Sequence, residues 1–292
     1  MNTLRFKFAV VGGAVVLGAL TLAGCPVSTE RNSFTVEKTL PFAADDLLSV
    51  NAKNGKISVH ATKNISEVRV TASVKVEMRQ YGSPTAVQHA LQDFLDEIEI
   101  KVVPVSVGVS IETISPEVSF PPDAIVTVDY DIEVPEQAGL RVDSGNGDVS
   151  IDGTIGSVDT DLGNGDISLT GIQGNLDVRL GNGSLQCLEI AGVIDAEVGN
   201  GRVTVSHKLP LLAEERWSVE VGNGSVTARL TEGSAFKVSA SASVGDIQKG
   251  CFGFDVDRQW PGIGEQANAQ EGEGGGTIDI SMGSGDIEFE CL

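Results

Sequence analysis

One motif recurs along the chain and decides the expected fold: SGNGDVSI at 144–151, LGNGDISL at 162–169, LGNGSLQC at 180–187 and VGNGRVTV at 198–205. The second glycine returns every 18 residues at first and less regularly later, at Gly147, Gly165, Gly183, Gly201, Gly224, Gly245 and Gly285. A fixed period of this size is typical of a solenoid, in which each coil buries its apolar face against its neighbours.

Apolar and polar residues alternate on both sides of each turn. After the turn, the apolar residues fall in the same two columns: Val149 and Ile151, Ile167 and Leu169, Leu185 and Cys187, Val203 and Val205. Alternate residues of a strand face opposite sides, so each coil is predicted to hold two short strands with their apolar sides inward. Cys187 lies in such a column and is predicted to be a buried, free thiol.

The asparagine and second glycine of each GNG turn have a structural explanation. Tight turns often need positive φ, which glycine accepts and asparagine tolerates. The stacked asparagines are also predicted to form a ladder of side-chain amides, each bonded to the next: Asn146, Asn164, Asn182, Asn200 and Asn223. The repetition is therefore explained as a corner of the solenoid, without any ligand.

The first 24 residues are predicted to be a lipoprotein signal peptide. Arg5 and Lys7 precede the apolar run 8–20, and the sequence 22–25, LAGC, closes it as a lipobox. The apolar run is too short to cross a bilayer core of ~30 Å. Cys25 is thus expected to carry diacylglycerol and a further acyl chain such as palmitate, which anchors the protein in a membrane. An ordinary signal peptide with an accidental cysteine is the alternative.

The remaining chain divides into three predicted parts. Residues 25–33 are expected to be a tether, 34–139 an N-terminal β-rich region and 140–292 the solenoid with a C-terminal cap. Within the second part, Ser83 and Pro84 can start a helix whose apolar residues share one face, so one inserted helix is expected near 84–97. The predicted fold class is all-β, a single-stranded β-solenoid (β-helix) of about 18-residue coils.

The charge of the chain limits its partners. Forty-one acidic residues against 20 basic ones give a net charge of −21. Such a chain repels nucleic acid and anionic lipid surfaces, so neither is an expected partner. The predicted partners are the membrane, through the lipid on Cys25, and an unknown component of the cell envelope or surface.

One outward column suggests cation binding, with a solvated face as the simpler alternative. Asp159, Asp177 and Asp195 should stack on successive coils about 4.8 Å apart, close to Arg179. A calcium site in the turns is not expected, because the position after the second glycine is Asp148 and Asp166 but then Ser184, Arg202 and Ser225.

Nothing in the sequence indicates catalysis, a cofactor or a metal centre. His60, His89 and His207 are far apart and are expected at the surface or in linkers. The sequence contains no G-x-S-x-G and no G-x-x-x-x-G-K motif. Cys251 and Cys291 could form a disulfide in an oxidising envelope, closing a loop of about 40 residues.

Two stretches carry a resemblance to a known family. AIVTVDYDIEVPEQAGLRVDSGNGDVSIDG at 124–153 and TLPFAADDLLSVNAKNGKISVHA at 39–61 resemble the putative-adhesin family of bacterial envelope proteins of unknown function. The resemblance covers about 34–292, apart from insertions at 84–122 and 250–276, and implies a β-solenoid at the cell envelope without implying any functional residue.

The expected function is that of a non-catalytic, lipid-anchored scaffold or adhesion-like interaction module in the bacterial envelope. Pro26 follows the lipidated cysteine, where aspartate would be typical of retention, so the outer membrane is expected if the cell has one. A polysaccharide-acting enzyme and an envelope-stress sensor on the same scaffold are the alternatives.

Overall fold

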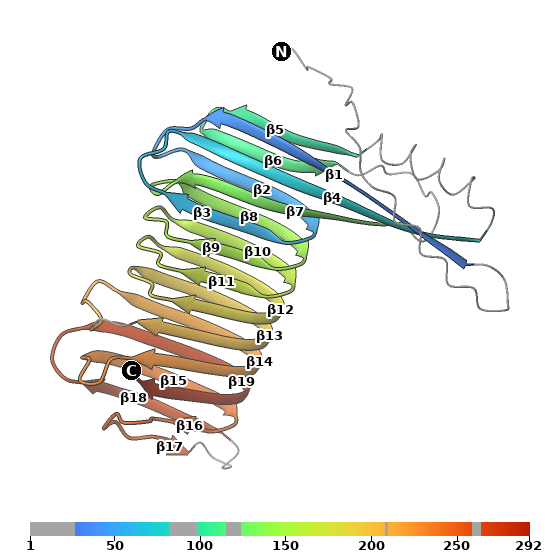
Figure 1. The fold of residues 1–292 in the computed structure, drawn as a ribbon. Helices are drawn as coiled ribbons and strands as arrows, with labels where there is room; N and C mark the ends of the chain where they lie inside the picture. Colours follow the sequence, from blue (N-terminus) through green and yellow to red (C-terminus); the bar gives the residue numbers. More distant parts are fainter. Residues whose placement is uncertain (1–26, 82–97, 115–123, 208–209, 259–263) are drawn as a thin grey trace.

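A computed structural model describes residues 27–81, 98–114, 124–207, 210–258 and 264–292 (Figure 1). These residues form an all-β structure in which 19 strands belong to one continuous sheet, and no helix occurs among them. The predicted signal peptide, Cys25 and the helix expected near 84–97 lie outside the described residues.

The strands follow one another along the chain as β1 (Val27–Pro41), β2 (Leu47–Asn54), β3 (Ile57–Thr62), β4 (Glu67–Tyr81), β5 (Glu99–Val105), β6 (Gly108–Ile114), β7 (Ala124–Pro135), β8 (Gly139–Asn146), β9 (Val149–Asp152), β10 (Val158–Asn164), β11 (Ile167–Thr170), β12 (Leu176–Leu188), β13 (Val193–His207), β14 (Arg216–Leu230), β15 (Phe236–Val244), β16 (Ile247–Gln248), β17 (Asp257–Arg258), β18 (Glu265–Glu271) and β19 (Gly276–Cys291).

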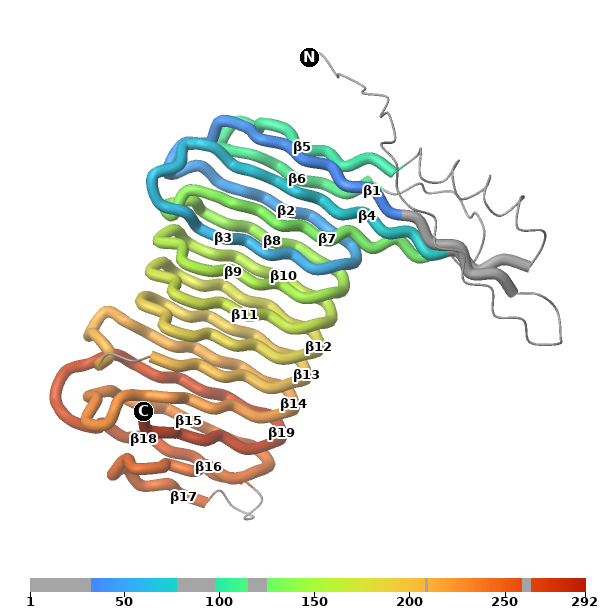
Figure 2. The backbone as a smooth tube through the Cα atoms, viewed as in Figure 1, coloured from blue at the N-terminus to red at the C-terminus, as the bar shows by residue number. Residues whose placement is uncertain are grey.

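The sheet folds into two walls, and the tube in Figure 2 shows the chain turning from one to the other in each coil. The GNG residues lie at this turn. The strands before each corner make the first wall, in the spatial order β5–β6–β2–β8–β10–β12–β13–β14–β19–β15–β18–β17. The segments after each corner make the second wall, β1–β4–β7–β3–β9–β11–β12–β13–β14–β19–β16. The long strands β12, β13, β14 and β19 run through the corner and belong to both walls.

Successive coils are parallel and in register. Ile167 pairs with Leu185, and Leu185 pairs with Val203, so each aliphatic residue lies over the same position of the previous coil. All three side chains are buried between the walls, because the strand alternation turns them inward and leaves the polar neighbours outside. Stacked aliphatic columns of this kind form one continuous core along the solenoid.

The stack begins earlier in the chain than the predicted boundary at residue 140. β2 pairs with β8 so that Asn54 lies beside Asn146, and β3 pairs with β9 so that Ile57 lies beside Val149. The early AKNGKISV motif is thus a full corner of the solenoid. It lies next to the 140–152 coil in space because β4, β5, β6 and β7, which stand between the two coils in the sequence, form the N-terminal end of the stack.

Most of the tether expected at 25–33 is part of a strand in the structure. Val27–Pro41 forms β1, which pairs antiparallel with β4 along its whole length, from Val27 opposite Tyr81 to Pro41 opposite Glu67. The partner strand supplies backbone hydrogen bonds across a separation of up to about 54 residues in the chain. A local sequence pattern does not reveal a partner at such a distance.

The last coils are not stacked in the order of the sequence. β19 lies between β14 and β15, so Gly285 stacks on Gly224, and β15 and β16 follow on the far side of β19. The asparagine column follows this spatial order: it continues to Asn223 and then changes to Ser284 and Val244. The copy with the most altered corner therefore lies furthest out.

Antiparallel strands close both ends of the stack. At the N-terminal end, β1, β4 and β7 pair in one wall and β5 with β6 in the other. The Lys38 ammonium group there donates a 2.9 Å hydrogen bond to the Val102 carbonyl oxygen, linking the two walls. Closing the ends matters because an open solenoid would expose unpaired strand edges.

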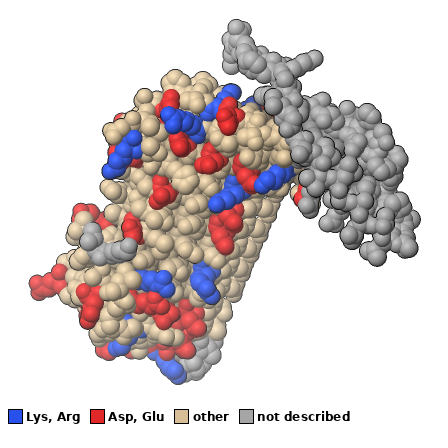
Figure 3. Space-filling model, viewed as in Figure 1, with Lys and Arg blue, Asp and Glu red and all other residues tan. Residues whose placement is uncertain are grey.

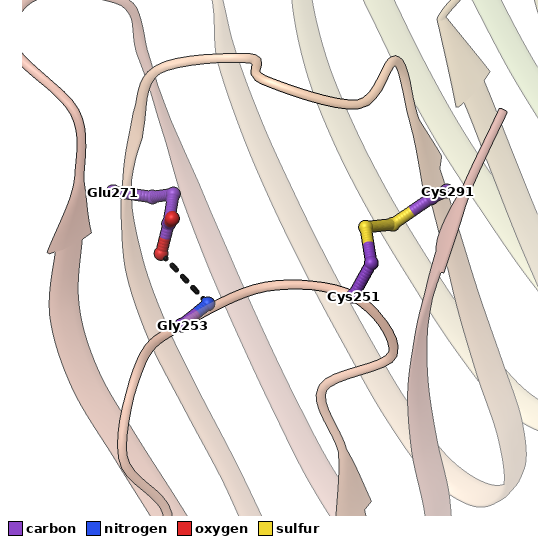
Figure 4. The surroundings of a disulfide bond; sticks show 4 residues. All are labelled: Cys251, Gly253, Glu271 and Cys291. Carbon is purple, nitrogen blue, oxygen red and sulfur yellow. Dashed lines mark hydrogen bonds between the residues drawn. A yellow bond between two sulfur atoms is a disulfide. The ribbon is translucent and has the colours of Figure 1, made fainter.

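The C-terminal end is closed by β15, β18 and β17, by a group of aromatic rings and by a disulfide. Phe236, Phe252, Phe254 and Phe289 pack with centroid distances of 5.1–6.5 Å. The disulfide joins Cys251 in the loop after β16 to Cys291 at the end of β19, and the Gly253 N–H donates to the Glu271 carboxylate close by (Figure 4). The C-terminal strand is therefore covalently held inside the stack.

Candidate functional site

The asparagines of the GNG corners form a hydrogen-bonded ladder. The ladder starts at the side-chain oxygen of Asn54. From there each side-chain NH₂ donates to the side-chain oxygen of the preceding asparagine at 2.9–3.1 Å, along the series Asn146, Asn164, Asn182, Asn200 and Asn223. The glycine that follows each asparagine has positive φ, for example +146° at Gly183. The corner residues thus hold one coil against the next.

Replacing Asn182 with alanine removes two rungs of the ladder, one to Asn164 and one to Asn200. Because the amides are exposed, we expect a loss of about 1–3 kcal/mol in the free energy of unfolding, near 0.5–1.5 kcal/mol for each bond. Urea denaturation followed by circular dichroism measures it. Ser168→Ala, a polar deletion on the outer surface of the neighbouring coil, is the control, and an equal loss in both variants would contradict the ladder's contribution.

The aspartates after the corner have a structural role that the sequence did not suggest. The Asp148 carboxylate accepts a 3.1 Å hydrogen bond from the Asp166 backbone N–H, and the Asp166 carboxylate accepts a 2.9 Å bond from the Ser184 N–H. Asp286 does the same for the Asp246 N–H at 3.0 Å. These carboxylates bind the backbone of the next coil, and their 18-residue recurrence was the signal from which this role could have been found.

The aspartates of the proposed cation stripe do form a column, but arginine side chains already pair with two of them. Asp159, Asp177 and Asp195 lie in register on adjacent coils. Arg141 approaches the Asp159 carboxylate at 3.0 Å, and Arg179 approaches that of Asp177 at 3.0 Å. The pKa of Arg179 is raised, chiefly by the charge of Asp177. No group of three or more His, Cys, Asp or Glu residues in the described part of the chain could hold a metal ion.

The three histidines are separate, and one of them differs from expectation. His60 is exposed, 3.8 Å from the Asp131 carboxylate, and His89 lies outside the described residues. His207 was expected at the surface but is only 6% exposed, with its Nε2 atom 3.5 Å from the Glu215 carboxylate. The Leu212 N–H donates to the same carboxylate at 2.7 Å, so Glu215 fastens the connection between β13 and β14.

The cysteines have structural positions. Cys187 is free and fully buried, and burial raises the pKa of its thiol to about 12. A thiol with such a pKa is not a thiolate nucleophile at neutral pH. Cys251 and Cys291 form the disulfide of the C-terminal end.

Each wall has a shallow concavity on its outer surface. The first, called the glycine trough, has a volume of about 490 Å³, lies on the first wall across β12, β13, β14 and β19, and is lined by Arg179, Leu180, Gly181, Glu197, Val198, Gly199, Glu220, Val221, Gly222, Ser281 and Gly283. The second, called the threonine trough, has a volume of about 530 Å³ and lies on the second wall across the same strands and β16. It is lined by Gln186, Leu188, Arg202, Thr204, Ser225, Val226, Thr227, Arg229, Gln248, Asp286, Glu288 and Glu290.

The charges are interleaved on the molecular surface. On the face in Figure 3, basic side chains lie among acidic ones and uncharged surface separates the groups. This distribution agrees with the Arg–Asp pairs found within a coil, at Arg179 and Asp177, and between coils, at Arg141 and Asp159. No helix in the described residues is long and apolar enough to cross a membrane.

A stack of parallel coils with polar corner ladders and closed ends defines the class of protein as a β-solenoid-like repeat protein. The chain belongs to the Toastrack DUF4097 family, which matches residues 12–290. No curated protein matches the chain.

Several solved structures are similar over most of their length. A putative cell adhesion protein from Clostridium sporogenes has 14% identity and a TM-score of 0.35, over 89% of this chain and all of that one. A putative adhesin from Parabacteroides distasonis has 11% identity and a TM-score of 0.32, over 88% and 97% of the two chains. A putative lipid binding protein from the same species has 9% identity and a TM-score of 0.23, over 88% and 96%.

Proposed function

We propose that the protein is a non-catalytic, lipid-anchored component of the bacterial cell envelope that acts as a scaffold or adhesion-like interaction module. The observation that carries this proposal is the bonding of its repeated polar residues from coil to coil. The asparagine ladder, the corner aspartates and the Arg141–Asp159 pair all join one coil to the next. Repeat proteins built in this way offer long, regular surfaces to other macromolecules.

The outer surfaces of the two walls are better suited to binding another molecule than to catalysis. Their outward columns alternate with buried ones, so each wall presents rows of side chains about 4.8 Å apart from coil to coil. On the first wall, the carboxylates of Asp159 and Asp177 are each paired with an arginine. Both carboxylates are therefore held by side chains of the protein itself. These features support an interaction surface.

The membrane anchor is the second part of the proposal. Cys25 is two residues before the first described strand in the sequence, which starts at Val27. Two or more acyl chains on Cys25 would hold the solenoid at a membrane surface, at the outer membrane where the cell has one. The lipobox sequence LAGC at 22–25 supports this part.

Changing Cys25 to serine should abolish lipidation. Cells grown with an alkyne analogue of palmitate should label the wild-type protein, and the variant should lose the label and move from the membrane fraction to the soluble fraction. Cys187→Ser is the matched control, because this thiol is buried and should not be acylated. A Cys25→Ser variant that keeps both its label and its membrane association would contradict the anchor.

The interaction role is tested on intact cells. A photo-crosslinking residue is placed at Glu220 on the first wall or at Thr204 on the second, both outward-facing positions. The proposal expects a recurrent adduct with one envelope component from at least one of these positions, and none from the buried position Val219. The enzyme alternative makes a different prediction. The protein would release reducing ends from cell-wall polysaccharide, and changing one carboxylate on a wall of the solenoid, such as Glu197→Gln, would abolish this release.

A further inference from the structure

The threonine trough has a floor of short side chains and a rim of long ones. Thr204 and Thr227 are neighbours in one outward column, and Ser225 stands beside them in the column nearer the corner. Longer polar side chains surround this floor: Gln186, Arg202, Arg229, Gln248, Glu288 and Glu290. The difference in side-chain length makes the concavity.

Some of the polar groups at the rim already bind other groups of the protein, and others are free to bind a ligand. The Arg229 guanidinium pairs with the Glu290 carboxylate at 2.6 Å, and the Asp286 carboxylate accepts the Asp246 N–H. Arg202 has no ion-pair partner within the described residues, and Gln186 and Gln248 are exposed at the ends of the trough. Hydroxyls, amides and one arginine therefore face the same hollow.

The shape of the trough fits an extended chain. It crosses five strands, from β12 to β16, along the axis of the solenoid. Four steps between coils span about 19 Å at 4.8 Å each. One step is comparable with the length of a pyranose ring, so the trough has room for roughly four sugar residues laid across the strands.

The charge of the trough favours neutral polymers over anionic ones as ligands. It holds two arginines and three carboxylates, a net of one negative charge, in a protein of net charge −21. Such a surface repels polyanions over the range of the Debye length. Neutral hydroxyl and acetamido groups, in contrast, match its mixture of donors and acceptors.

From the shape, the chemistry and the charge, we infer that the threonine trough binds a neutral, hydroxyl-rich oligosaccharide of about four residues along the solenoid axis. The inference deepens the proposed interaction function by naming the class of ligand. The threonine trough is the better candidate, because the floor of the glycine trough is a column of glycines and its volume of about 490 Å³ is more exposed to solvent.

The test uses the detergent-solubilised full chain and isothermal titration calorimetry with three probes: cellotetraose, chitotetraose and tetragalacturonate. At least one neutral probe should bind, and the anionic tetragalacturonate should bind at least tenfold more weakly. Thr227→Tyr should reduce the affinity at least tenfold, because the ring fills the floor of the trough. Ser150→Tyr is the matched control, since Ser150 is half-exposed on the second wall outside the trough, and it should keep the wild-type affinity.

A second variant guards against misfolding of the first. Gln186→Ala removes an exposed rim amide and should weaken binding about 2- to 10-fold, as expected for lost hydrogen bonds. The inference is overturned if neither neutral probe binds, if tetragalacturonate binds best, or if Thr227→Tyr and Ser150→Tyr behave alike with both folded. Such a failure leaves the crosslinking test of the proposed function untouched, because that test does not depend on a sugar ligand.

Discussion

Replacing Gly183 with alanine should destabilise the protein by more than about 4 kcal/mol, in the range of the most damaging single substitutions. A β-carbon at this position would lie 1.7 Å from the Gly165 carbonyl oxygen, and the residue has φ = +146°. The obstacle is the backbone of the adjacent coil, which cannot move without breaking the parallel register. We expect the variant to be largely unfolded or aggregated when assayed by circular dichroism and by urea denaturation.

Gly233→Ala is the matched control. Gly233 also has positive φ, +80°, but a β-carbon there would meet no atom within 4 Å. Its replacement should cost only the conformational penalty of a left-handed residue, about 1–2 kcal/mol. If the two substitutions have the same effect, the close stacking of the corner glycines is wrong.

Removing the disulfide should have the next largest effect. The double variant Cys251→Ser, Cys291→Ser opens a loop whose ends are separated by 40 residues. The chain-entropy model gives a stabilisation of about 4 kcal/mol for a loop of this size. The loop also includes β18 and most of β19, the strand that lies between β14 and β15, so the loss should be concentrated at the C-terminal end.

Guanidinium denaturation with and without a reductant measures this effect. The wild-type midpoint should fall on reduction to that of the double variant, and reduction should not change the variant further. Equal midpoints for the oxidised wild type and the variant would show that the bridge does not contribute to stability.

The repeated part of the fold could be predicted because its information is local and periodic. Ile167, Leu185 and Val203 share a column in the aligned copies, and the structure pairs them in that register. The same holds for the asparagines of the corners, since an 18-residue period places them beside one another. Regular alternation is the strongest signal for a strand that buries one face.

The parts that were missed depend on contacts between distant or irregular segments. The order of β14, β19 and β15 could not be read from the sequence, because the copies at Gly245 and Gly285 are both imperfect. His207 is buried with its Nε2 atom 3.5 Å from the carboxylate of Glu215, which is also buried and which no motif in the sequence links to it.

The threonine trough could not be predicted from the sequence for a similar reason. It arises from differences in side-chain length within outward columns, such as Thr204 between Gln186 and Thr227. An alternating pattern marks these positions as polar and outward but does not show that they form a hollow. Only the stacked coils bring the short and long side chains together.

Spin-label distances along one outward column test the stacked arrangement most directly. With one label at Ser58, the second is placed at Thr204, Thr227, Glu288 or Gln248, which lie four, five, six and seven coil steps away. At 4.8 Å for each step, double electron–electron resonance should give distances that rise from about 19 to about 34 Å in that order. Distances that fail to rise step by step, or that place Gln248 nearer than Glu288, would contradict the parallel stack and its inserted C-terminal strand.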